Sequence, residues 1–191
     1  MSKLAVITGA SSGIGAEFSR QLAPTHDSLW LIGRREDKLN SVAVEIRAQY
    51  GVEARVLVMD LSDLSTIDQL ALELQQQKQL STLINNAGYA EDGDFHELDW
   101  QLHGDLMNVH IETTLKLSYA ALKVMTSNSQ STIINVASVA SFMPTPESPL
   151  YGPTKAFVRS LGETLAVKYK DRNIKIQALC PGFTITDFHR H

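Results

Sequence analysis

The chain has 191 residues, 43% hydrophobic and 20% charged, with a formal net charge of −4 at pH 7. This composition fits one soluble globular domain, and the scattered basic residues argue against nucleic acid and membrane surfaces as partners. The single cysteine, Cys180, excludes an internal disulfide and fits a reducing compartment, so we expect a cytoplasmic protein without a membrane-spanning stretch.

Short apolar runs alternate with longer runs of helical periodicity along the whole chain. Strands are predicted at Leu4–Thr8, Ser28–Gly33, Ala54–Asp60, Thr82–Asn85, Thr132–Ser138 and Lys175–Cys180. The two longest helical runs are Asp99–Thr126 and Pro153–Lys170. Strands separated by helices of this length predict right-handed crossovers and a parallel sheet with helices on both faces. We therefore expect one three-layer, doubly wound α/β domain of the Rossmann type with about six strands.

The first strand is followed by a glycine-rich turn and then by a helix. Glycines in such a turn let the backbone approach a pyrophosphate, and the start of the helix offers free N–H groups. A glycine-rich turn without a ligand is the alternative, but its place after the first strand favours a dinucleotide site. The expected cofactor contacts in this turn are Gly9, Ser11, Ser12, Gly13, Ile14 and Gly15.

The end of the second strand carries the signal for the type of cofactor. An acidic residue about 20 positions after the glycines would bind a ribose 2′-hydroxyl and repel a 2′-phosphate. Gly33 occupies that place, and Arg34 and Arg35 follow. Because a guanidinium suits a phosphate, NADP(H) is favoured, with NAD(H) as the alternative. Arg34 is the expected selector and Arg35 is expected beside the adenine; two surface charges at a helix start are the other interpretation.

The strongest chemical signal is Tyr151 with Lys155, four residues apart and therefore on one helical face. A phenol beside a cation loses its proton more readily and can act as a general acid or base. Ser138 lies upstream at the end of a predicted strand and could hold a carbonyl or alcohol oxygen. Tyr119 and Lys123 have the same spacing but lie inside a helical run with no strand before it, so we interpret them as a coincidental match.

These motifs have the order and spacing of a known family. They are Thr8-Gly9-x-x-x-Gly13-x-Gly15, Asn85-Asn86-Ala87-Gly88, Ser138, Tyr151-x-x-x-Lys155 and Pro181-Gly182. Together they resemble the short-chain dehydrogenase/reductase family over essentially the whole chain. The residues after Pro181-Gly182 are similar to a bacterial branch whose substrates are broad or unassigned.

The resemblance implies further site residues. It places Asp60 at the adenine with Leu61 packed nearby, although a helix cap explains Asp60 as well; Ser62-Asp63 could cap the same helix equally well. It places Asn86, Ala87 and Gly88 beside the cofactor and leaves Asn85 mainly structural. Asn108 matches the family's fourth catalytic position, in a proton relay through water, and a satisfied core asparagine is the alternative. The segment with Pro181, Gly182, Thr184 and Thr186 is expected to contact the phosphates or the carboxamide.

The implied function is an NADP(H)-dependent interconversion of a carbonyl and an alcohol by hydride transfer, with Tyr151 as acid or base, on a small molecule. No metal is expected, because His103, His110 and the terminal His189 and His191 lack further ligands at a suitable spacing. The family commonly forms homodimers or homotetramers.

Relatives run considerably further than His191, so we expect residues 1–191 to form a single domain without the family's C-terminal substrate segment and last strand. This departure keeps a second interpretation open, namely a non-catalytic NADP(H)-binding or regulatory module. A third, an epimerase or dehydratase, shares the fold and the Tyr–Lys pair but usually has a larger substrate domain.

Overall fold

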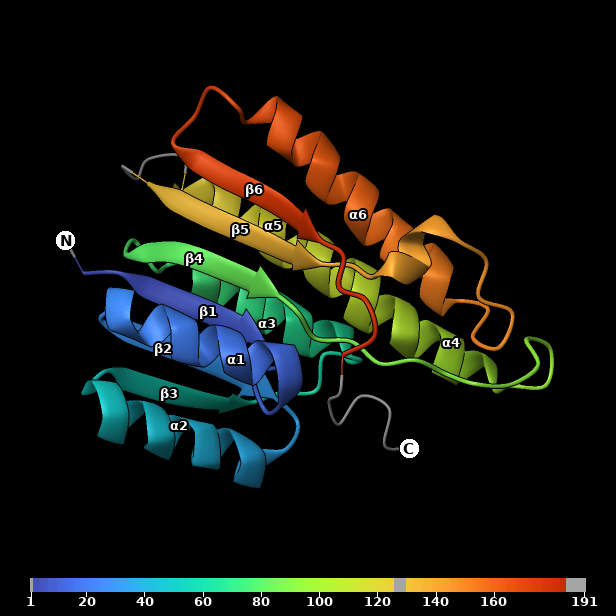
Figure 1. Cartoon of the computed structure of the whole chain (residues 1–191), viewed down its shortest axis with the longest axis horizontal. Helices are drawn as coiled ribbons and strands as arrows, with labels where there is room; N and C mark the ends of the chain where they lie inside the picture. The colour runs from blue at the N-terminus through green and yellow to red at the C-terminus, as the bar shows by residue number, and fades with distance from the viewer. Residues whose placement is uncertain (1, 126–129, 185–191) are drawn as a thin grey trace.

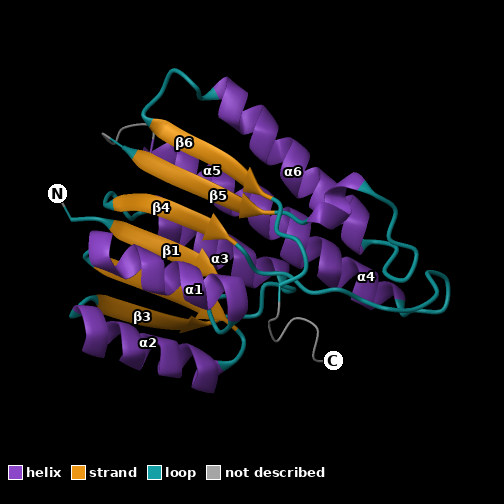
Figure 2. Cartoon of the chain, viewed as in Figure 1, coloured by secondary structure: helices purple, strands orange, loops and turns teal. Residues whose placement is uncertain are grey.

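A computed structural model describes residues 2–125 and 130–184 of the chain. The described residues form one parallel sheet in the order β3-β2-β1-β4-β5-β6, with helices on its two faces (Figures 1 and 2). The strands are β1 (Leu4–Thr8), β2 (Ser28–Gly33), β3 (Glu53–Val58), β4 (Leu80–Asn85), β5 (Ser131–Val136) and β6 (Ile174–Leu179). The strand order reverses between β1 and β4, which creates a crevice at the carboxyl ends of the strands. The prediction of a doubly wound α/β fold is confirmed.

The helices connect successive strands. They are α1 (Gly13–Leu22), α2 (Glu36–Tyr50), α3 (Leu64–Gln75), α4 (Trp100–Met107), α5 (Thr113–Met125) and α6 (Tyr151–Lys168). Short turns of 3₁₀-helix, η1 (Ala23–Thr25) and η3 (Val139–Phe142), follow α1 and β5. A π-helical turn, η2 (Asn108–Glu112), joins α4 to α5, so the long predicted run is not one regular helix. The Thr113 backbone N–H and hydroxyl both donate to the Asn108 carbonyl and hold this wider turn in place.

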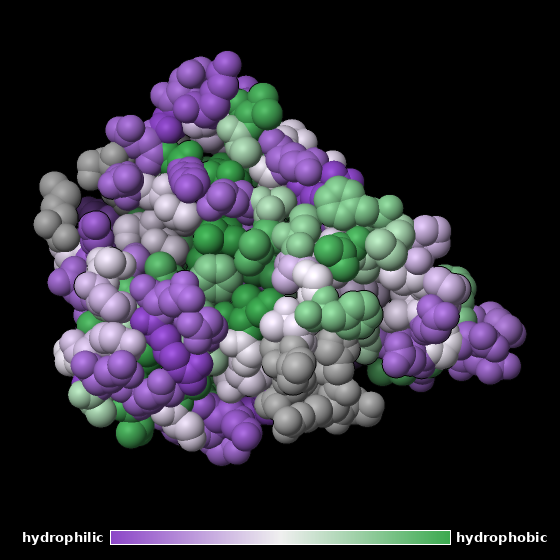
Figure 3. Space-filling view, in the orientation of Figure 1, coloured by the Kyte–Doolittle hydropathy of each residue, from purple (hydrophilic) through white to green (hydrophobic). Residues whose placement is uncertain are grey.

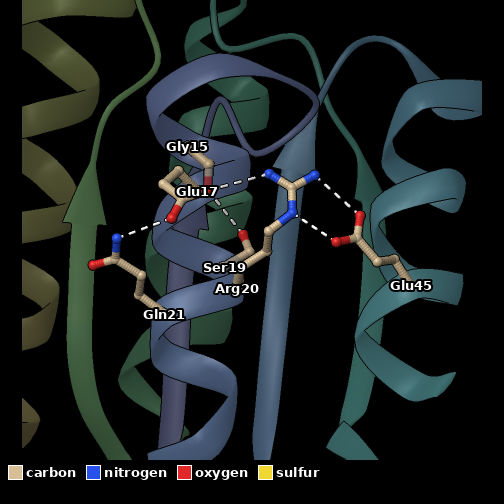
Figure 4. A network of polar contacts seen from close by, with 6 residues as sticks. All are labelled: Gly15, Glu17, Ser19, Arg20, Gln21 and Glu45. Carbon is tan, nitrogen blue, oxygen red and sulfur yellow. Dashed lines mark hydrogen bonds and ion pairs between the residues drawn. The ribbon is translucent and has the colours of Figure 1, made fainter. Parts of the chain in front are cut away.

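Helices α1 and α2 cover one face of the first three strands. Buried side chains of β1 and β2, such as Ile7 and Leu31, pack there against Leu39 and Ile46 of α2. At the surface Arg20 of α1 donates two hydrogen bonds to Glu45 of α2, at 2.7 and 3.0 Å (Figure 4). These contacts fix the direction in which α1 leaves the glycine-rich turn.

The opposite face of the sheet is covered by α3, α5 and α6, whose apolar residues share one core with β1, β2, β4, β5 and β6. On the α1 and α2 side, the strands β4 to β6 become steadily more exposed. Ile84 of β4 is buried, its neighbour Ile134 of β5 is half-buried, and Leu179 of β6 is 39% exposed. Figure 3 shows hydrophobic surface over the middle of the sheet in this region. Among the described helices, none is long and apolar enough to cross a membrane.

Candidate active site

The glycine-rich turn brings the start of α1 against the end of β1. Gly9 and Gly13 have φ angles of +66° and +54°, in the left-handed region that favours glycine. A Cβ on Gly15 would lie 2.2 Å from the Gly9 carbonyl oxygen, so no larger residue fits there. Ser12, the residue before α1, makes no capping hydrogen bond through its side chain. The tight turn and the uncapped helix start therefore fit a pyrophosphate approaching the backbone.

The loop after β4 is tied to the same turn. The Thr8 hydroxyl accepts hydrogen bonds from the backbone N–H of Asn86 and of Ala87, at 2.9 and 3.0 Å. The Asn86 amide donates to the Thr8 and Gly9 carbonyls at 3.0 and 3.2 Å. Asn85 points into the core, where its amide donates to Asn135 and Ser118. Asn86 thus holds the two sides of the crevice together at the switch point.

Arg34 and Arg35 lie at the mouth of this crevice but have different partners. The Arg35 guanidinium donates to the Ser11 hydroxyl at 3.0 Å and to the Ser12 hydroxyl at 2.5 Å. Its positive charge therefore lies over the glycine-rich turn. The Arg34 guanidinium lies 5.9 Å from the centre of the Tyr89 ring, on the other side of the crevice. Both cations border the surface where a nucleotide would lie, and Arg35 also stabilises the turn itself.

Ser138, Tyr151 and Lys155 meet at the carboxyl end of β5. Ser138 ends the segment after β5 and accepts a hydrogen bond from the Ala140 backbone N–H at 3.2 Å. The Lys155 ammonium donates to the Val136 carbonyl at 3.0 Å and lies 5.7 Å from the centre of the Tyr151 ring. The side chains of a strand end and of the first turn of α6 thus converge on one point.

Burial governs the ionisation of this group. Burial raises the pKa of the Tyr151 phenol, and a hydrogen bond with Ser138 acts in the opposite direction. Burial lowers the pKa of the Lys155 ammonium to about 8. We expected Lys155 to lower the pKa of Tyr151, but the net shift of Tyr151 is upward because the loss of water around the phenol outweighs its favourable contacts. A protonated phenol at neutral pH suits proton donation.

Three residues near the adenine side have mainly structural contacts here. Asp60 accepts hydrogen bonds from the Ser62 backbone and hydroxyl, at 3.0 and 2.8 Å. The residue that caps α3 is Asp63, whose carboxylate accepts a hydrogen bond from the Ser65 N–H; Asp60 does not cap this helix. Leu61 buries its side chain in the core, which leaves only its backbone for a cofactor contact. Of the two caps that the sequence allowed, Asp60 is therefore wrong and Asp63 is confirmed.

Asn108 is the first residue of the π-helical turn. Its amide donates to the Ser62 carbonyl at 2.8 Å, so the side chain has a protein partner without any water. Its backbone carbonyl already accepts the two bonds from Thr113. π-Helical turns are frequent at functional sites.

The segment after β6 returns to the site. The Pro181 carbonyl accepts a hydrogen bond from the Val139 N–H at 3.1 Å, which brings this segment beside Ser138. The Thr184 hydroxyl donates to the Gly182 carbonyl at 3.1 Å and stays exposed. Thr186, also predicted to contact the cofactor, lies outside the described residues.

Two histidines that the sequence excludes as metal ligands, His103 and His110, are buried near the site. His110 contacts Tyr89 and Thr154, and Thr154 precedes Lys155 on α6. His103 donates to the Phe95 carbonyl at 2.9 Å and lies 3.5 Å from a Glu91 carboxylate oxygen. Spacing along a regular helix could not reveal the position of His110, because the π-helical turn changes the direction of its side chain. No cluster that could hold a metal ion occurs in residues 2–125 and 130–184.

Comparison with known proteins agrees with this geometry. A very-long-chain 3-oxoacyl-CoA reductase from Anas platyrhynchos is 34% identical over 188 residues. The match covers 95% of this chain and 60% of that protein. An uncharacterised oxidoreductase of Staphylococcus epidermidis is 31% identical, and the match covers 96% of this chain and 79% of that protein. The chain thus spans less than two thirds of the length of the first of these relatives.

Solved structures are similar over nearly the whole chain. A short-chain dehydrogenase from Sphingobium yanoikuyae in complex with NADPH matches with a TM-score of 0.92 and 30% identity, covering 97% of this chain and 73% of that one. A bulky-bulky ketone specific alcohol dehydrogenase from Comamonas testosteroni matches with a TM-score of 0.89 and 29% identity, covering 94% and 72%. The family model for short chain dehydrogenases matches residues 3–191. The chain belongs to the short-chain dehydrogenase/reductase family of oxidoreductases.

Proposed function

We propose that the protein interconverts a carbonyl and an alcohol with NADP(H) as its preferred cofactor and Tyr151 as the acid or base. The observation that carries this proposal is the convergence of Ser138, Tyr151 and Lys155 at the carboxyl end of β5, beside the glycine-rich turn. Relatives of known structure were determined with NADPH, which supports the choice of cofactor.

The chemistry follows from these three side chains. A bound nicotinamide supplies the hydride for reduction and accepts it for oxidation. In reduction the protonated Tyr151 phenol donates its proton to the carbonyl oxygen. The Ser138 hydroxyl donates a hydrogen bond to the same oxygen and stabilises the charge that develops there. Lys155 keeps a positive charge near the phenol below its pKa of about 8, and favours the phenolate after proton transfer.

The preference for NADP(H) rests on Arg34, Arg35 and the lack of an acidic side chain at Gly33. Two guanidinium groups border the place that a 2′-phosphate would occupy, and Arg35 reaches the hydroxyls of Ser11 and Ser12. An acidic residue at the end of β2 would repel a 2′-phosphate, whereas these cations attract it.

The substrate that fits best is a hydrophobic carbonyl compound. Phe142, Met143 and Phe183 are 63%, 57% and 95% exposed in segments that flank Ser138. Similar proteins act on bulky ketones and on 3-oxoacyl-CoA, according to their names, which supports an apolar substrate.

A non-catalytic NADP(H)-binding module is the second candidate. The exposure of Leu179 on β6 favours it, because among the described residues the strands beside Ser138 are less covered than those beside the glycine-rich turn. One experiment separates the two candidates. The purified chain is mixed with NADPH or NADH and a panel of aliphatic ketones, aromatic ketones and aldehydes, and cofactor oxidation is followed at 340 nm while cofactor binding is titrated separately. Turnover that prefers NADPH supports the enzyme; tight binding without turnover on any carbonyl supports the module.

A further inference from the structure

The imidazole of His110 lies where three elements of the site meet. It belongs to the π-helical turn η2, and only 1% of the residue is exposed. Its ring meets the Tyr151 and Tyr89 rings edge to face, with centres 5.8 and 6.1 Å apart. A Cβ on Gly88 would lie 2.8 Å from His110 Nε2 and 3.1 Å from Lys155 Nζ. The imidazole therefore packs directly behind the proposed catalytic pair.

The partners of His110 define the direction of each hydrogen bond. The Tyr89 backbone N–H can only donate, and it lies 3.1 Å from Nε2, so Nε2 accepts. A neutral imidazole that accepts at Nε2 carries its hydrogen on Nδ1, which lies 2.7 Å from the Thr154 hydroxyl oxygen. The Thr154 hydroxyl in turn donates to the Tyr151 carbonyl at 2.9 Å. In this series of hydrogen bonds each donor has one acceptor. Tyr89 donates to His110, His110 donates to Thr154, and Thr154 donates to Tyr151.

The surroundings keep the imidazole neutral. Burial and the nearby Lys155 ammonium hold the pKa of His110 well below its ordinary value. The titratable groups that face it are Lys155 and Tyr151 of α6 and Tyr89 of the loop after β4. A second proton on Nε2 would point at the Tyr89 N–H and break the first link of the chain. Loss of that hydrogen-bond acceptor would release the Tyr89 end of the loop from α6, while Asn86 and Ala87 stay bonded to Thr8.

We infer that His110 is a positioning residue that, as the Nδ1–H tautomer, locks the loop Asn86–Tyr89 to the first turn of α6. This loop borders the proposed cofactor and the first turn carries Tyr151, so the lock sets the distance between the hydride donor and the proton donor. The inference rests on the proposed function. Misplacement of reacting groups by about 1 Å can lower the rate about 100-fold, which makes such a lock valuable.

Three single variants and one double variant test the lock through kinetics. In His110→Gln the amide offers one acceptor and one donor, as neutral histidine does, whereas His110→Leu offers neither. We expect His110→Leu to lower kcat about 10-fold or more, with less than about 3-fold change in the Kd for NADPH and in the KM for the ketone. His110→Gln should recover most of kcat. Thr154→Val, which removes the next link, should lower kcat to a similar extent, and the double variant with His110→Leu should be no slower than either single variant.

A second readout needs no substrate. In the ¹⁵N NMR spectrum of the wild-type protein at pH 7, the His110 ring should show a protonated Nδ1 and an unprotonated Nε2. If the wild type reduces no carbonyl, the proposed function fails, while this signal still tests the lock. A protonated Nε2, equal losses in folded His110→Gln and His110→Leu, or wild-type kcat in His110→Leu would each overturn the inference.

Discussion

The two halves of the sheet differ in how completely they are covered. In the half formed by β1, β2 and β3, α1 and α2 cover one face and α3 helps to cover the other. In the half formed by β4, β5 and β6, α5 and α6 cover one face, and on the opposite face exposure increases from Ile84 to Leu179 among the described residues. The strands of both halves pair in parallel.

The covered half and the more exposed half of the sheet carry different parts of the proposed site. The covered half carries the glycine-rich turn and the two arginines, which are the residues of the proposed nucleotide site. The open half carries Ser138, Tyr151 and Lys155 at its edge and exposed apolar residues around them. Substrate specificity can vary there without disturbing the nucleotide site, since function within a fold depends on the local site.

The largest expected effect separates chemistry from nucleotide binding. Tyr151→Phe removes the proton donor, and we expect kcat to fall by about 10³-fold or more, while the Kd for NADPH stays near that of the wild type. The matched control is Tyr119→Phe, which has the same Tyr-x-x-x-Lys spacing but is 60% exposed on α5. It should keep full activity. Appreciable turnover by Tyr151→Phe would remove Tyr151 from its proposed role.

A pair of leucines tests the difference in cover itself. Leu31 of β2 is fully buried, whereas Leu179 of β6 is 39% exposed. Leu31→Ala should lower the free energy of unfolding by about 2–5 kcal/mol, because it leaves a cavity in a closed core. Leu179→Ala should change it by about 0.5 kcal/mol or less, as expected for a partly solvated site. Urea unfolding of both variants measures the difference. Equal losses would mean that the open face is covered in solution.

Arg34 and Arg35 test which side chain of the covered half distinguishes NADPH from NADH. We expect Arg34→Ala to weaken NADPH binding about 10- to 100-fold and to leave NADH binding unchanged, because it removes a charge-assisted contact to the 2′-phosphate. Arg35→Ala also loses the bonds to Ser11 and Ser12, so it should weaken both cofactors. Titration by fluorescence with NADPH and NADH compares the two variants. The reverse pattern would make Arg35 the selector.

The last prediction is a gain of stability in the open half. The pKa of Lys155 falls from 10.5 to about 8 on folding, so below pH 8 the folded protein bears the cost of a buried charge. Lys155→Met should therefore raise the free energy of unfolding by about 1–3 kcal/mol at pH 7 and abolish turnover. Between pH 8 and 10.5 the unfolded state binds more protons, so wild-type stability rises with pH and the gain shrinks. Urea unfolding at pH 7 and pH 9.5 checks this sign; a constant gain would contradict it.

Several features could be predicted from the residues alone, for identifiable reasons. The boundaries of Leu4–Thr8 and Ser28–Gly33 agree with the structure because buried parallel strands are continuous apolar runs between polar turns. The predicted strand Ala54–Asp60 ends earlier, at Val58; the Met59 N–H still donates to the Gly33 carbonyl of β2, and the chain turns from Asp60, whose carbonyl accepts from the Asp63 N–H. The glycine-rich turn and the Tyr–Lys pair were recognisable because their chemistry depends on residues close together in the sequence.

Other features depended on contacts between distant segments. Arg35 reaches Ser11 from the end of another strand, and periodicity carries no information on that contact. The π-helical turn depends on Thr113 bonding to Asn108, and only this wider turn aims His110 at Tyr89 and Thr154. The net upward shift in the pKa of Tyr151 arises from burial by loops that follow other strands.

The sequence by itself determined the α/β alternation, the glycine-rich turn after the first strand and the Tyr151–Lys155 spacing, because local spacing and hydrophobic pattern encode them. Tertiary structure alone decided which side chains face one another, how far burial shifts their ionisation, and which strands are the more exposed among the described residues. Those properties depend on distances between segments and on exclusion of water, and neither quantity exists before the strands pack side by side.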